Sequence, residues 1–202
     1  MTDLRSRDLL AFHDGRHRVA GWAKSGAADH GSGAWQAIED NHRFNCLLWD
    51  EEDLARRRHV SDAEIAKNKR AIDGYNQKRN DAIERIDEHL LAALAGVAPK
   101  PDARLNSETA GGMVDRLSIL SLKIHHMRLQ TLRTDVDAAH LESCRAKLAR
   151  LEEQRGDLAG CLDRLLEECA RGEAYFKVYR QFKMYNDPKL NPAVYGERKP
   201  AA

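Results

Sequence analysis

Hydrophobic residues recur at intervals of three and four over most of this 202-residue chain, which is the period of an α-helix that buries one face. Two such stretches, 61–95 and 136–170, contain no proline and would each form a helix about 50 Å long at 1.5 Å per residue. No short window is rich enough in β-branched residues to predict a strand. The sequence therefore predicts an all-α fold: a single-domain bundle of five to six helices, two of them long.

Local signals divide the chain into helices. The clearest is Ser61-Asp62-Ala63-Glu64, a capping box in which the Ser61 and Glu64 side chains each bond the other residue's backbone N–H. Shorter helices are predicted over 5–24, 33–57 and 113–133. We expect residues 1–32 to form a helix and a Gly/Ala-rich loop packed on a bundle of residues 33–192, with a tail at 193–202.

The charge balance limits the partners of the chain. Lys+Arg (33) and Asp+Glu (32) nearly cancel, so we expect no nucleic-acid binding, which needs an excess of positive charge. With no apolar run long enough to cross a bilayer and no export signal, we also expect a cytoplasmic protein that binds no membrane. The four cysteines lack a CxxC spacing and are predicted to be small, mostly buried side chains. They are Cys46, Cys144, Cys161 and Cys169.

Two helical faces carry polar residues where a packed helix normally has apolar ones. On the helix predicted over 61–95 this face reads Ile65, Lys69, Ile72, Asn76, Arg79, Ile83, Ile86 and Leu90. On the helix predicted over 33–57 it reads Trp35, Ile38, His42, Asn45, Trp49, Glu52 and Arg56.

An antiparallel hairpin of these two helices would match the polar positions. Its short connection sets the pairs Glu52–Lys69, Trp49–Ile72, Asn45–Asn76, His42–Arg79, Ile38–Ile83 and Trp35–Ile86. A buried polar group without a partner costs about 1–3 kcal/mol. The layers must therefore satisfy one another, hold water or hold a ligand, and two interpretations stay open: a polar layer that fixes helix register, or a pocket.

The pocket interpretation predicts a small anionic metabolite as ligand. Arg79, Lys69 and His42 would contact the anion, and Asn45 and Asn76 would orient it. If the protein is an enzyme, His42 and Glu52 are the candidate catalytic residues, with Glu52 as a general base or, alternatively, a salt-bridge partner. The Gly111-Gly112 pair before the helix predicted at 113 could bring backbone N–H groups to an anion, with Arg116 one turn later.

A metal-dependent hydrolase is a second hypothesis, although our preferred assignment includes no metal. Glu39-x-x-His42 and Glu84-x-x-Asp87 have the spacing that places two ligands on one side of a helix. Against this, the chain contains one Glu-x-x-His and lacks the Glu-x-x-Glu of helical magnesium hydrolases.

A third hypothesis is a structural protein that forms homo-oligomers through its long helices. No motif identifies a cofactor or a nucleophile.

Two further features stay open. His125 or His126 could offer an inward imidazole. The aromatic segment 175–185 is predicted to pack as a C-terminal helix on the bundle, and the alternatives are that it covers a pocket or stacks on bases.

The polar blocks resemble the bacterial domain-of-unknown-function family 4254. The resemblance rests on residues 41–45 with Leu48 and Trp49, 51–53, 69–73, 76–81, 83–87, 106–109, 113–120 and 179–188. It implies an all-helical cytoplasmic protein and no established activity. Members of the family are often found beside sugar-transfer genes, which would suit a role around phosphorylated sugars or in a biosynthetic pathway. The resemblance assigns no catalytic residue.

Overall fold

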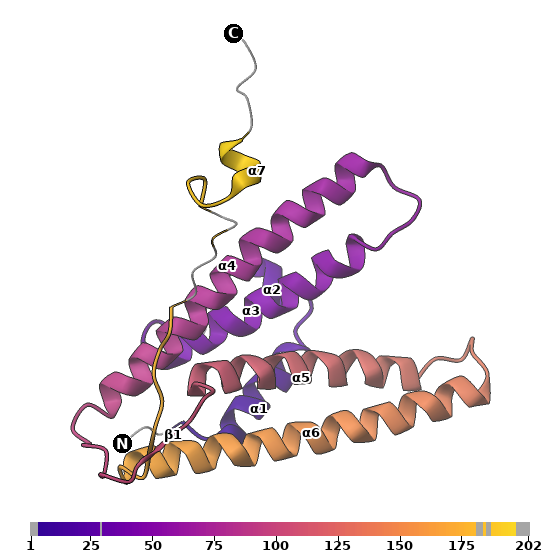
Figure 1. The fold of residues 1–202 in the computed structure, drawn as a ribbon. Coiled ribbons are helices and arrows are strands. Elements are labelled where there is room, and N and C mark those ends of the chain that lie inside the picture. Colours follow the sequence, from indigo (N-terminus) through magenta and orange to yellow (C-terminus); the bar gives the residue numbers. More distant parts are fainter. Residues whose placement is uncertain (1–3, 29, 181–183, 185–186, 197–202) are drawn as a thin grey trace.

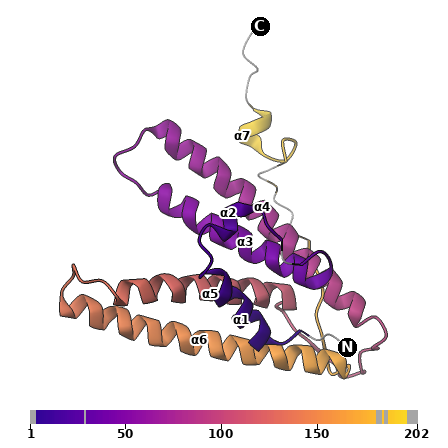
Figure 2. The same cartoon turned by 180° about the vertical axis from the view of Figure 1, so that it is seen from behind.

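A computed structural model describes residues 4–28, 30–180, 184 and 187–196. Two antiparallel helical hairpins form a V (Figures 1 and 2). The first pairs α3 (Gly33–Leu54) with α4 (Asp62–Ala93), and the second pairs α5 (Ala110–Thr131) with α6 (Ala138–Ala170). The hairpins pack together near the connection between α4 and α5 and diverge toward their own loops. The predicted all-α bundle with two long helices is confirmed.

The N-terminal region lies against both hairpins (Figure 2). The single helix predicted over 5–24 is two helices, α1 (Ser6–Arg16) and α2 (Trp22–Ser25), separated by a turn that ends at Gly21 with a φ of 69°. Helix α1 packs against α5 and α6, and α2 packs against α3. The first residue of α1 is fixed by α6, because the Ser6 backbone N–H and hydroxyl donate to the Asp163 carboxylate at 2.9 and 2.7 Å.

Capping residues set where the long helices begin. The predicted capping box at Ser61 and Glu64 is confirmed. Helix α5 begins three residues before the predicted Met113, because the Thr109 side chain accepts from the Gly112 N–H and caps the helix there. The Gly111-Gly112 pair is therefore part of the first turn of α5.

Gly111 allows α5 to approach α4 closely. A Cβ at this position would lie 2.6 Å from the Ile83 carbonyl oxygen and 2.8 Å from the Asp87 side chain. Because the Ile83 oxygen belongs to a helix backbone, it cannot move aside, and only glycine fits. The acceptor at the N-terminus of α5 is a carboxylate of the protein and not a bound anion, because the Gly111 N–H donates to Asp87 at 2.6 Å.

The described residues contain one strand pair, formed by the α4–α5 connection and the segment that follows α6. β1 (Arg104–Leu105) and β2 (Ala174–Tyr175) pair in parallel and join the two hairpins where they meet. Such a short pair leaves no periodic signal in the sequence. The aromatic segment is not a helix from Phe176 to Arg180, although Phe176 is buried; residues 181–183 and 185 lie outside the described part. Helix α7 (Pro192–Tyr195) follows.

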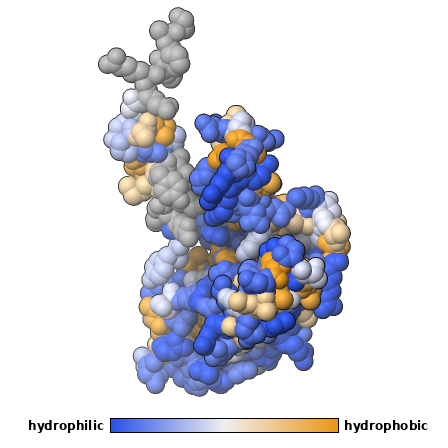
Figure 3. Space-filling model, turned by 90° about the vertical axis from the view of Figure 1, so that its right-hand side faces the viewer, coloured by the Kyte–Doolittle hydropathy of each residue, from blue (hydrophilic) through white to orange (hydrophobic). Residues whose placement is uncertain are grey.

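The hydrophobic core lies where α1, α3, α4, α5 and α6 meet. Its largest fully buried side chains are Leu9, Ile38, Ile86, Val114, Leu117 and Leu162. Figure 3 looks onto the open end of the V, where the tips of the hairpins stand apart and the surface is largely hydrophilic. Within the described residues, no helix combines the length and apolar character needed to cross a bilayer.

Candidate functional site

The α3–α4 hairpin has nearly the predicted register. Asn68 donates a hydrogen bond to Glu51 at 2.7 Å, and the rings of Phe44 and Tyr75 stack at 6.3 Å. Each contact lies one residue along each helix from a predicted pair, Glu52–Lys69 and Asn45–Asn76 respectively. The two helices are therefore antiparallel, and the pairing brings Asn45, Glu52, Asn76 and Arg79 to one cavity.

A cavity of about 340 Å³ lies between α3, α4 and α5. Four of the predicted site residues line it: Asn45 and Glu52 from α3, and Asn76 and Arg79 from α4. The other lining residues are Leu48, Trp49, Asp53, Arg56, Ile119 and Leu122. The cavity therefore combines an apolar wall from α3 and α5 with amide and guanidinium groups, which is the usual composition of a small-molecule site.

A second cavity, of about 610 Å³, adjoins the first and shares Trp49 and Asp53 with it. It lies between α3, α5 and α6. Its remaining lining residues are Lys123, His126, Met127, Gln130, Lys147, Arg150 and Leu151. The Trp49 and His126 rings stack at 4.3 Å with an interplanar angle of 8°. We refer to the two adjoining cavities as the cleft.

Asp115 organises the buried end of the cleft. Its Oδ1 accepts hydrogen bonds from the side-chain amides of Asn41 at 2.8 Å and Asn45 at 2.9 Å. The Nε of Arg79 lies 4.0 Å from the same oxygen, which is too far for a hydrogen bond. Asp115 thus holds the Asn45 amide in place and stabilises the Arg79 charge without bonding that nitrogen.

Two N–H donors in the cleft walls have no hydrogen-bond partner among the described residues. They are Nε of Arg79 and Nε1 of Trp49, and both atoms are buried. Most buried donors in proteins are satisfied, and an unsatisfied one often marks a place for water or an ion. The side chain of Arg79 is about one quarter exposed, so its guanidinium is partly accessible from the cavity that it lines.

Lys69 and Arg116 lie outside the cleft, contrary to the predicted roles. Lys69 pairs with Asp73 at 3.1 Å, and Arg116 pairs with Glu108 at 2.7 Å. Both side chains are at least half exposed. Long charged side chains remain in water where the helix face allows it, because burial would remove their hydration. Glu52 does line the cleft, but its carboxylate pairs with Arg56 at 2.6 Å.

His42 points away from Arg79, toward α1 and α5. Its Nδ1 lies 2.8 Å from the Ser118 hydroxyl, and its ring stacks on His13 at 4.4 Å. Burial, followed by the neighbouring His13 and His17, holds the pKa of His42 well below its usual value; a hydrogen bond to the His13 backbone acts in the opposite direction. His42 lines neither cavity of the cleft, so the geometry gives it no contact with a ligand bound there.

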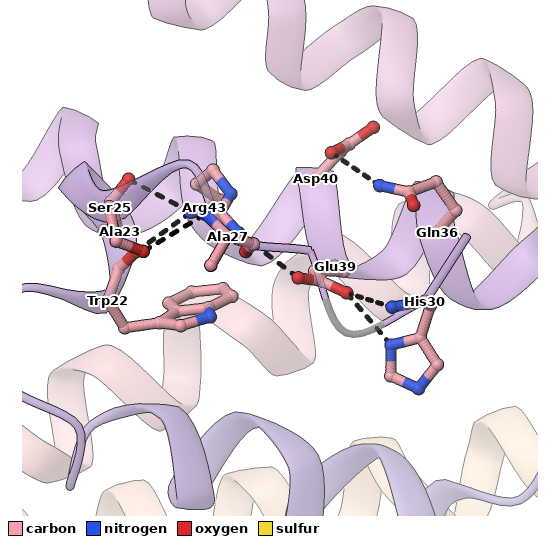
Figure 4. A network of polar contacts seen from close by, with 9 residues as sticks. All are labelled: Trp22, Ala23, Ser25, Ala27, His30, Gln36, Glu39, Asp40 and Arg43. Carbon is pink, nitrogen blue, oxygen red and sulfur yellow. Dashed lines mark hydrogen bonds and ion pairs between the residues drawn. The ribbon is translucent and has the colours of Figure 1, made fainter. Parts of the chain in front are cut away.

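The residues of the metal-hydrolase hypothesis do not converge. Glu39 is fully buried, and its carboxylate faces the backbone N–H and Nδ1 of His30 at 3.1 and 3.0 Å (Figure 4). It also accepts from Arg43 at 3.2 Å, and Arg43 donates to main-chain carbonyls of residues 22–27. This Glu39–Arg43 clamp holds the loop before α3 onto the helix. Glu39 therefore already has partners for its charge.

Glu84 and Asp87 also have other partners. Glu84 lies 3.9 Å from Arg180, and Asp87 accepts from Gly111 at the start of α5. Among the described residues, the group of three donors close enough to share a metal ion is instead His17, His42 and Cys46. These residues come from α3 and from the segment that follows α1.

A histidine-rich core is the feature that sequence reasoning missed. His13 is fully buried, and burial lowers its pKa to about 3. His17 stacks on His125 at 4.7 Å, and burial lowers the pKa of His17 to about 4. The i, i+4 spacings His13–His17 and His42–Cys46 place each pair on one helix face, and this spacing is the signal that could have found them.

Burial of Asp87 predicts a pH effect on stability. Burial raises the pKa of Asp87 from 3.8 to about 6. Because the folded-state pKa of Asp87 lies above the unfolded value, the protonated carboxyl stabilises the folded protein. This contribution is complete below pH 3.8 and is lost as the pH rises through about 6. Between pH 4 and 6 the free energy of unfolding of Asp87→Asn should rise relative to that of the wild type by about 1.4 kcal/mol per pH unit, because the wild type alone loses this contribution. The measurement is urea unfolding.

The control for this experiment is Asp81→Asn on the same helix, where Asp81 is exposed and accepts from Gln77. Its stability relative to the wild type should not change over the same pH range. Equal pH dependence of the two variants would contradict the assignment of a raised pKa to Asp87.

The model of a family described as protein of unknown function (DUF4254) matches residues 35–178. This segment contains all but the first two residues of α3, the whole of α4 to α6, and every residue that lines the cleft. No curated protein and no solved structure matches the chain. The match agrees with the resemblance found in the polar blocks.

Proposed function

The chain belongs to the DUF4254 family, and we propose that it binds a small anionic or phosphorylated metabolite in the cleft between its two hairpins. Arg79 contacts the anion, Asn45 and Asn76 orient the ligand, and Trp49 provides an apolar wall. The observation that carries this proposal is the position of Asn45, Asn76 and Arg79 around one cavity, where the Arg79 Nε has no hydrogen-bond partner in the described part of the chain.

The charge of the cleft favours an anion. Its walls contain the basic residues Arg56, Arg79, Lys123, Lys147 and Arg150 and the acidic residues Glu52 and Asp53. Positive charge in a concave site with low-dielectric walls raises the local concentration of anions and speeds their binding. A guanidinium also offers two parallel N–H donors to a carboxylate or phosphate. A phosphate at Arg79 would therefore find both charge complementarity and directed hydrogen bonds.

Arg79→Met is the first test. A charge-assisted hydrogen bond contributes about 1.5–3 kcal/mol, so the substitution should weaken ligand binding about 10- to 100-fold. The measurement is thermal unfolding with a panel of inorganic phosphate, sugar phosphates and nucleoside phosphates. At a ligand concentration of about 100 Kd, the wild type should gain about 2.7 kcal/mol, a rise in Tm of roughly 5–10 °C.

The matched control is Arg85→Met, since Arg85 is on the same helix and pairs with Asp40 outside the cleft at 2.8 Å. It should retain the full ligand-induced rise in Tm. The unliganded Arg79→Met protein should be as stable as the wild type or more stable, because a polar group kept for function commonly reduces stability. A ligand that stabilises the wild type and Arg79→Met equally would contradict the proposal.

A further inference from the structure

Three metal-capable side chains meet beside the cleft. His17 and His42 each offer one ring nitrogen and Cys46 offers its Sγ, and these three atoms lie within 4.8 Å of one another. The Cys46 Sγ lies 3.9 Å from Nε2 of His42. A tetrahedral Zn²⁺ site with bond lengths of 2.0–2.3 Å needs ligand atoms about 3.5 Å apart. The side chains would therefore have to move together by about an ångström, which is within the range of small rotamer adjustments.

Hydrogen bonds hold the His42 ring in the orientation that a metal ligand requires. Its Nδ1 bonds the Ser118 hydroxyl at 2.8 Å, which accepts from the Asn45 amide at 3.0 Å. Asn45 is held in turn by Asp115. A histidine that binds metal through Nε2 commonly bonds a fixed acceptor through Nδ1–H. With Nδ1 bonded to Ser118, Nε2 of His42 is the ring nitrogen that lies 3.9 Å from the Cys46 Sγ.

The alternative of a merely structural histidine cluster leaves polar atoms unexplained. Nε2 of His17 is buried without a hydrogen-bond partner among the described residues. Both ring nitrogens of His13, which stacks on His42, are also buried and have no hydrogen-bond partner in the part of the chain that the structure describes. Unpaired buried nitrogens reduce stability, and a bound cation would give the His17 nitrogen a partner.

We infer that His17, His42 and Cys46 form a site for a divalent transition-metal ion of the zinc type. Two imidazole nitrogens and one thiolate are the ligand set that Zn²⁺ prefers over Mg²⁺ or Ca²⁺. Binding releases the Cys46 proton to solvent, because the thiolate is the ligand. Three protein ligands leave a fourth position for water. The inference does not depend on the proposed anion site, since none of the three residues lines the cleft.

Cobalt substitution tests the site directly. The full-length protein is freed of metal with a chelator and titrated with Co²⁺. We expect one equivalent to bind and to produce a sulfur-to-cobalt charge-transfer band in the near ultraviolet. Cys46→Ser should abolish the band. His17→Gln should weaken Co²⁺ and Zn²⁺ binding more than about 100-fold, because loss of an outer-shell partner alone costs 10- to 100-fold.

The chain contains a matched control in Cys144 and His140 on α6. They have the same i, i+4 spacing, with Sγ 3.4 Å from Nε2, but belong to no group of three donors among the residues described. Cys144→Ser should bind Co²⁺ like the wild type. Circular dichroism in the helical region shows whether each variant is folded. If Cys46→Ser does not fold, His17→Gln serves as the second variant, because His17 is only half buried. No charge-transfer band in the wild type, or a band that persists in Cys46→Ser, would overturn the inference.

Discussion

Glu39→Ala is expected to destabilise the protein by about 3–5 kcal/mol, the typical cost of removing one member of a buried ion pair. Glu39 is fully buried, and its carboxylate holds both Arg43 and the backbone of His30. Without it, the nearly buried Arg43 guanidinium loses its counter-charge, and the loop before α3 loses its attachment. The measurement is urea unfolding at neutral pH, followed by helical circular dichroism.

The neighbouring residue provides the control for Glu39. Asp40 pairs with Arg85 at 2.8 Å, but both side chains are partly exposed. Pairs exposed to solvent contribute about 0–1 kcal/mol, so Asp40→Ala should have a small effect. The loss of stability in Glu39→Gln should lie between those of Glu39→Ala and Asp40→Ala, because glutamine keeps hydrogen bonds and lacks the charge. If Glu39→Ala and Asp40→Ala cost the same, the clamp does not stabilise the fold in the way described.

Asp115→Ala is expected to destabilise the protein by about 2–6 kcal/mol, because it removes the acceptor of two buried amides at about 1–3 kcal/mol each. The side-chain amides of Asn41 and Asn45 both donate to Asp115 Oδ1, and each would be left buried without that acceptor, at about 1–3 kcal/mol. Arg79 would also lose the closest negative charge. Denaturant unfolding again provides the measurement, and the adjacent Arg116→Ala, which breaks an exposed pair, is the control.

Asp115→Asn separates the two roles of this residue. The amide oxygen can still accept from Asn41 or Asn45, so the loss of stability should be smaller than for Asp115→Ala. Removing the negative charge 4.0 Å from Arg79 should also strengthen anion binding in the cleft, because the guanidinium charge is then uncompensated. Weaker phosphate binding by a folded Asp115→Asn protein would show that Asp115 does not oppose the anion.

The sequence predicts much of the fold because the signals are local. The spacing of apolar residues defines α4 and α6, and Ser61 and Glu64 define the start of α4. The short connection after α3 leads directly to the antiparallel pairing. That pairing places Asn45, Asn76 and Arg79 near one another, because helix geometry fixes side-chain direction once the register is set.

Contacts between distant segments could not be predicted in the same way. The inward turn of His42 depends on α1, which brings His13 against it, and on Ser118 of α5. Glu39 has the spacing of a metal ligand, but its role is decided by His30 and Arg43. Likewise, the sequence suggests an anion-binding role for the Gly111-Gly112 pair, whereas the missing Cβ of Gly111 allows contact with Ile83. In each case tertiary packing, which carries no short sequence signal, decides the outcome.

Binding of an anion by the Arg79 guanidinium inside the cleft is the part of the proposed function on which the rest depends. Its most direct test is two-dimensional NMR of the arginine Nε–H and asparagine side-chain amide signals during titration with inorganic phosphate. We predict a saturable shift of the Arg79 Nε–H and Asn76 amide signals, with those of Arg85 unchanged. Signals of Arg79 and Asn76 that stay fixed while exposed arginines shift would contradict the claim.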